Sequence, residues 1–131
     1  MPLIMKINKD LGLMLYWGEG DKTGNYFVAL TNTNPEILNY FVTWLRKYFK
    51  INEQKLKCRL YLWDFLNESK AKLFWSRKLN IPLNQFTKTY FSKSKPNVRK
   101  IKHENGVCRI SYGSTDIFKQ ITLEINKNFC E

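Results

Sequence analysis

One acidic residue, Glu19, stands between Gly18 and Gly20 at the end of an apolar run that begins at Leu11. A carboxylate placed beside so apolar an element is costly unless it is paired or bound to a cation. Magnesium is bound by few carboxylates and otherwise by water and phosphate oxygens. Such ions activate water and stabilise the leaving oxygen when a phosphodiester is cleaved. Glu19 is therefore the candidate catalytic residue for metal-dependent phosphodiester cleavage, the alternative being a helix-terminal acid in an ordinary loop.

An apolar helix is expected to hold Glu19 in place. The residues from Leu11 to Trp17 are nearly all apolar, which is typical of a buried helix or a buried strand. A cap at Asn8 or Asp10 favours the helix. Because a helix that is apolar on every side must be covered on every side, we expect it to lie centrally or to pack against a second copy of the chain. The residues expected at such a dimer interface are Leu11, Gly12, Met14 and Leu15.

The segment from Leu11 to Phe49 resembles the LAGLIDADG homing endonuclease family. In both, an apolar helix ends in a Gly-acid-Gly tip, and a strand then leads through an Asn/Thr turn into a second helix. The resemblance implies that Glu19 is the metal-binding acid and that the backbone carbonyl of Gly18 adds a ligand. Because the chain has a single motif, it is similar to the homodimeric members, in which two copies of the acid meet at a two-fold axis.

Caps and periodic apolar positions place the remaining elements. Strands are predicted over residues 26–31, 55–63, 86–91 and 107–112, and later helices over 35–49, 66–79 and 115–129. The apolar stripes of these helices are Leu38, Phe41, Val42, Leu45 and Phe49, then Leu66, Leu73, Phe74 and Trp75, and finally Ile117, Phe118, Ile121 and Ile125. We predict an α+β fold, one domain over residues 1–131, with one mixed or antiparallel sheet of about four strands and helices on one face. The resemblance implies half of a LAGLIDADG saddle.

The strand predicted over residues 55–63 has the clearest alternation in the chain. Its leucines and Cys58 occupy every second position, and three cations, Tyr61 and Trp63 occupy the others. A period of two places the leucines on a core and the cations and aromatic rings on the opposite, open face. A solvated outer face, or lysines that protect an edge strand, is the alternative reading. Aromatic rings sharing a face with cations favour binding of nucleic acid.

The basic charge is concentrated around that sheet. The formal net charge is +11, from 22 Lys and Arg against 11 Asp and Glu. This balance predicts a polyanionic partner, nucleic acid first and an acidic membrane second. Between residues 92 and 106 the expected long connection carries five cations and one acid, Glu104. The residues predicted to contact nucleic acid are Lys55, Lys57, Arg59, Tyr61, Trp63, Lys88, Lys93, Lys95, Arg99, Lys100, Lys102 and Arg109.

Other classes of site have little support in the sequence. The three cysteines are far apart, which argues against a disulfide framework and fits a reducing, cytoplasmic location. Their spacing and the single histidine, His103, argue against zinc, and no nucleotide-cofactor fingerprint is present. Cys108 is expected to be a packed core cysteine. No signal peptide, membrane-spanning segment or membrane partner is expected.

Three functions follow from these patterns. The first is a homodimeric, Mg²⁺-dependent, site-specific double-strand DNA endonuclease that uses Glu19, as the resemblance implies. The second is a DNA-binding regulator of the same fold that does not cleave. The third is an RNA-binding module, because aromatic rings on a sheet can stack on bases.

Overall fold

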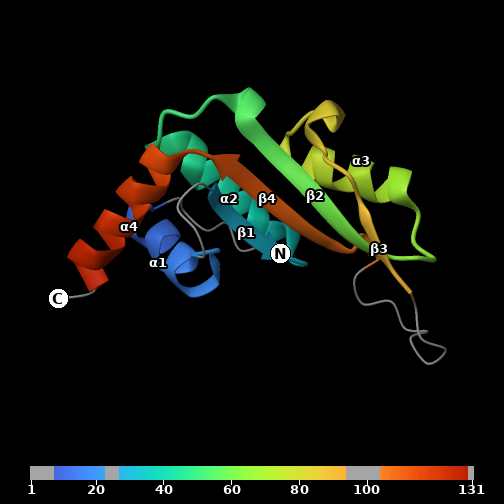
Figure 1. Cartoon of the computed structure of the whole chain (residues 1–131), viewed down its shortest axis with the longest axis horizontal. Coiled ribbons are helices and arrows are strands. Elements are labelled where there is room, and N and C mark those ends of the chain that lie inside the picture. Colours follow the sequence, from blue (N-terminus) through green and yellow to red (C-terminus); the bar gives the residue numbers. More distant parts are fainter. Residues whose placement is uncertain (1–7, 23–26, 94–103, 130–131) are drawn as a thin grey trace.

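Four strands form one open, mixed sheet in the computed structural model, which describes residues 8–22, 27–93 and 104–129. The strand order is β1-β4-β2-β3 (Figure 1). The strands are β1 (Phe27–Asn32), β2 (Leu56–Trp63), β3 (Tyr90–Ser92) and β4 (Val107–Gly113). Strand β4 pairs antiparallel with β1 and with β2, whereas β3 pairs parallel with β2. The predicted α+β class and mixed four-stranded sheet are confirmed.

The helices begin where the sequence places their caps. They are α1 (Lys9–Glu19), α2 (Pro35–Tyr48), α3 (Glu68–Leu79) and α4 (Thr115–Phe129), with short 3₁₀ turns η1 (Glu53–Lys55) and η2 (Leu83–Gln85). Side-chain oxygens of Asn8, Asn34, Asn67 and Ser114 accept hydrogen bonds from backbone N–H groups of the first turns. Such caps satisfy donors that have no partner within the helix.

The core lies between the helices and one face of the sheet. Helices α2 and α3 lie behind the strands in Figure 1, with α1 and α4 toward the β1 side. The alternate residues of β2, from Leu56 to Leu62, are buried, as are the predicted stripes of α2 and α4. On α3, Trp75 is fully buried, but the prediction for Leu73 is wrong. Leu73 is 43% exposed because it lies on the outward side of α3.

Helix α1 is amphipathic in its packing although its sequence is apolar on all sides. Gly12, Leu13 and Tyr16 face inward and are buried. A Cβ atom at Gly12 would lie 2.2 Å from the indole of Trp44 in α2, and that indole donates a hydrogen bond to the Lys9 carbonyl. Gly12 was predicted to lie at a dimer interface, but it is buried where α1 packs closely against Trp44 of α2 within one chain.

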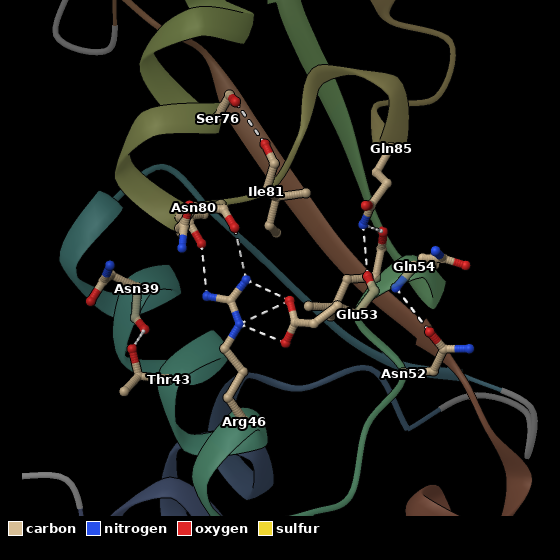
Figure 2. Close-up of polar contacts among 12 residues, drawn as sticks. Asn39, Thr43, Arg46, Asn52, Glu53, Gln54, Ser76, Asn80, Ile81 and Gln85 are labelled. Carbon is tan, nitrogen blue, oxygen red and sulfur yellow. Dashed lines mark hydrogen bonds and ion pairs between the residues drawn. The ribbon is translucent and has the colours of Figure 1, made fainter.

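A hydrogen-bonded junction joins α2, α3 and η1 (Figure 2). The Arg46 guanidinium forms a bidentate ion pair with the Glu53 carboxylate and donates to the carbonyls of Leu79 and Asn80, each at 2.9 Å. Asn80 adopts the left-handed conformation (φ 54°) that ends α3. Because bidentate arginine pairs fix geometry as well as charge, this junction fixes the C-terminal end of α3 relative to α2 and η1.

The strand predicted over residues 86–91 is shorter in the structure. The chain forms η2, then one isolated bridge between Phe86 and Cys58, and only Tyr90–Ser92 pairs as β3. The Gln85 side chain donates to the carbonyls of Glu53 and Leu56. These side-chain hydrogen bonds hold Gln85 against η1 and the start of β2. They take the place of the continuous backbone pairing that a longer strand would form.

Candidate nucleic-acid interface

The open face of the sheet gathers cations and aromatic rings from three strands. Arg59 lies directly opposite Arg109, Lys57 opposite Ser111, and Tyr61 opposite Tyr90. Their strand neighbours Cys58, Leu60, Cys108 and Ile110 are buried on the helical side. The predicted separation of leucines from cations on β2 is thereby confirmed.

The centre of this face is a shallow depression that we call the cationic hollow. It has a volume of about 340 Å³ and is lined by Phe27, Lys57, Arg59, Thr87, Arg109 and Ser111. The Arg59 Nε donates to the Thr87 hydroxyl at 3.2 Å. Like charges directly opposite each other on neighbouring strands destabilise a sheet. Two arginines on neighbouring strands therefore leave an excess of positive charge in the hollow, which favours binding of an anion there.

One acid reaches this face from the end of α1. Asp21 Oδ2 lies 3.2 Å from Arg109 Nη2, and the Asp21 N–H donates to the Ala29 carbonyl of β1 at 2.9 Å. The Tyr16 hydroxyl donates to the Asp21 carbonyl. Burial raises the pKa of Tyr16 to about 12, so this hydroxyl keeps its proton at neutral pH. These contacts anchor the end of α1 to the β1 edge of the sheet.

Aromatic rings continue the face toward the β3 edge. The Tyr61 and Tyr90 rings stack with centroids 5.8 Å apart. The Arg59 guanidinium lies 4.9 Å from the Tyr90 ring centroid, and Lys88 Nζ lies 6.0 Å from it. Sequence reasoning missed Tyr90, although its position two residues after Lys88 placed it on the same side of the predicted strand.

The other predicted contacts lie at the ends of the sheet. Trp63, half-buried, pairs with Ser92 at the end of β2, and Lys93 is exposed just beyond β3. Lys55 lies in η1, with its Nζ 5.2 Å from the ring centroid of Tyr112. Tyr112 is buried on the helical side of the sheet. Lys55 therefore lies apart from Lys57, Arg59 and Arg109 on the open face. Outside the described residues lie Lys95, Arg99, Lys100 and Lys102.

Glu19, the predicted metal ligand, is exposed at the last position of α1. Nearby, the Lys22 ammonium donates to the carbonyls of Trp17 and Gly20, at 2.6 and 3.1 Å. Within residues 8–22, 27–93 and 104–129, no three His, Cys, Asp or Glu side chains are grouped to hold a metal ion. One protomer thus offers the carboxylate of Glu19, while that of Asp21 is paired with Arg109. The predicted magnesium site would therefore need a second Glu19 carboxylate from another copy of the chain, as the resemblance implies.

The outward side of α1 carries three large exposed apolar residues. Leu11, Met14 and Trp17 are 42%, 52% and 43% exposed, and Leu15 is half-buried. Among residues 8–22, 27–93 and 104–129, no atom would lie within 4 Å of a Cβ atom at Gly18. Leu11, Met14 and Gly18 follow helical spacing along one side, so packing among the described residues does not explain the glycine at position 18.

The cysteines and helices show no second type of site in the part of the chain that the structure describes. Cys58 and Cys108 are free and buried, and burial raises the pKa of the Cys108 thiol. Cys108 is the packed core cysteine that was predicted. Across the described ranges, every helix is too short or too polar to cross a membrane.

Comparisons with protein-family models, curated proteins and solved structures gave no match for this chain.

Proposed function

We propose that the protein binds duplex DNA through the open face of its sheet. The observation that carries this proposal is the group of three cations, Lys57, Arg59 and Arg109, that lines the cationic hollow on the open face. Arginine guanidinium groups bind phosphate oxygens in bidentate geometry, and phosphate contacts supply most of the affinity of proteins for DNA. The net charge of +11 adds long-range attraction to the same partner.

Duplex DNA fits the shape of this face better than a compact anion does. The cations of β2 and β4 are spread along the two central strands of the four-stranded sheet, where they can contact several phosphates of a polyanion and not one compact anion alone. Tyr61 and Trp63 on the same face favour RNA as the competing partner. The comparison of the two nucleic acids is therefore part of the test.

The test measures binding of the unmodified protein to a duplex DNA library over a range of salt concentrations. Contacts from Lys57, Arg59 and Arg109 predict a slope of log affinity against log salt of about −3. Single-stranded RNA of the same length serves as the competitor. Salt-independent binding, or a strong preference for the RNA, would overturn the proposal.

Substituting Asp21→Asn is expected to tighten duplex binding. The change keeps the shape of the side chain and removes the charge that now pairs with Arg109, which frees the guanidinium for phosphate. An ion pair at the surface contributes up to about 1 kcal/mol, and this pair is partly buried, so we expect a gain in affinity of about two- to fivefold. Fluorescence anisotropy at fixed salt measures it, with Asp10→Asn in the first turn of α1 as the control for net charge. An equal gain in both variants would show that Arg109 is not the site of the effect.

We propose, as a second candidate, that two copies form the Mg²⁺-dependent endonuclease that the resemblance implies. The exposed side of α1, with Leu11, Met14 and the open space at Gly18, favours close approach of a second copy. That approach would bring two Glu19 carboxylates together, with the Gly18 carbonyls as further ligands. The ion, when bound, would activate water and stabilise the leaving oxygen, while Arg59 and Arg109 hold the flanking phosphates.

Substituting Glu19→Gln is expected to abolish cleavage of a selected duplex site and leave its binding nearly unchanged. The amide keeps the shape of the side chain but cannot replace the charge of a metal-bound carboxylate. Nicking of the selected site with Mg²⁺, with Mn²⁺ and with a chelator measures the effect. If the unmodified protein binds the selected site tightly and never cuts it, the DNA-binding regulator replaces the endonuclease.

Assembly is tested separately by light scattering at tens of micromolar. The double change Leu11→Glu and Met14→Glu should convert dimers to monomers, whereas Leu123→Glu on α4, where Leu123 is 68% exposed, should not. A monomeric unmodified protein would count against the endonuclease and leave DNA binding by the sheet untouched.

A further inference from the structure

The edge of the sheet beside the cationic hollow presents a stacked pair of tyrosine rings. Tyr61 of β2 lies opposite Tyr90 of β3, with their rings inclined by 17°. Tyr90 is 45% exposed although Tyr61 covers part of it. Strand β3 is the outermost strand in the order β1-β4-β2-β3, so the Tyr90 ring lies at the rim of the open face.

Arg59 connects this ring pair to the phosphate contacts. Its guanidinium lines the cationic hollow and also lies 4.9 Å from the Tyr90 ring centroid. Lys88 Nζ lies near the same ring, and Lys93 is exposed just beyond β3. A nucleic-acid strand held by a phosphate at Arg59 and running toward β3 would pass the Tyr90 ring and the cations Lys88 and Lys93.

We infer that Tyr90, supported by Tyr61 and Arg59, stacks on an unpaired base of the bound DNA. Aromatic side chains stack on bases without needing a particular sequence. Inside a duplex both faces of each base are covered by neighbouring base pairs, so an aromatic ring reaches a base that has left the stack. The preferred DNA is thus a duplex with a short single-stranded overhang. This inference rests on the proposed function, because the duplex must first bind through Arg59.

A purely structural role for the ring pair makes a different prediction. Strand β3 has three residues, and cross-strand aromatic pairs stabilise sheets. If Tyr90 only held β3 in place, its removal would weaken binding of every DNA equally. If Tyr90 stacks on a base, its removal affects DNA with an unpaired base alone.

The experiment compares three ligands: a blunt duplex, the same duplex with a three-nucleotide adenine overhang, and that duplex with an abasic overhang. The overhang should raise the affinity of the unmodified protein at least about fivefold over the blunt duplex, since stacking contributes about 1–3 kcal/mol per base. The abasic overhang adds the phosphates without the bases and should give little of this gain. Tyr90→Leu should lose the gain, whereas Tyr90→Phe, which keeps the ring, should retain it.

A second measurement does not depend on how well the variants fold. An overhang carrying 5-iodouracil, irradiated in complex with the unmodified protein, should crosslink to the peptide that contains Tyr90. Equal affinity for the adenine and abasic overhangs, or a crosslink elsewhere, would overturn the inference. Absence of binding to the blunt duplex would instead overturn the proposed function, so the two failures are distinguishable.

Discussion

Substituting both Arg59→Gln and Arg109→Gln is expected to lower duplex affinity about a hundredfold at about 0.1 M salt. At this ionic strength, exposed charges are only partly screened. Each guanidinium is expected to contribute about one tenfold step, or about 1.4 kcal/mol, through charge-assisted hydrogen bonds to phosphate. The slope of log affinity against log salt should become less negative by about two. Anisotropy titrations at several salt concentrations measure both quantities.

The matched control removes the same charge from the helical side. Lys70 and Arg77 are exposed on α3, so the double change Lys70→Gln and Arg77→Gln should leave affinity nearly unchanged. An equal loss in both double variants would mean that net charge, not the open face, governs binding. The Arg59/Arg109 variant removes two like charges from neighbouring strands but also loses the Arg109–Asp21 ion pair and the Arg59–Thr87 hydrogen bond, so urea unfolding of this variant accompanies the titrations.

Substituting Gly12→Ala is expected to lower the free energy of unfolding by about 2 kcal/mol or more. The added Cβ would lie 2.2 Å from the indole of Trp44, which is fully buried and packs against Phe41 and Phe49. Overpacking of this kind typically costs about 1–3 kcal/mol, and here the fully buried Trp44 indole or helix α1 must shift to make room. The higher helix propensity of alanine, worth about 1 kcal/mol, offsets only part of the cost.

The same substitution at Gly18 provides the control. A Cβ there would meet no atom of the described part of the chain within 4 Å, so Gly18→Ala should be neutral or stabilising by up to about 1 kcal/mol. Urea unfolding of both variants at low protein concentration measures the contrast. Equal stability of the two variants would show that α1 does not pack on Trp44 as described.

Local patterns in the sequence determined most of the secondary structure. Asn8, Asn34 and Asn67 cap helices because their side chains need partners only within the next three residues. The alternation along β2 fixed which side chains face the core, since a strand side chain has only two directions available. Likewise, the stripes of α2 and α4 specified their buried sides by helical period alone.

Only the tertiary structure decided how α1 packs. Its residues are apolar on every side, so hydrophobicity could not show which side faces inward. The side of α1 that holds Gly12 faces inward because the Trp44 indole leaves room there for a glycine and for no larger residue. The tertiary structure also places Leu73 on the outward side of α3, outside the core.

The candidate site also depends on contacts that no local pattern specifies. Arg59 and Arg109 meet because β2 and β4, about fifty residues apart in sequence, pair in one register. Asp21 reaches Arg109 across 88 residues, and Tyr90 meets Tyr61 through a parallel pairing of only three residues. The sequence by itself determined that cations and aromatic rings share a face. The register of the strands decided which of them touch, because a shift of one residue would move every one of these side chains to the other face.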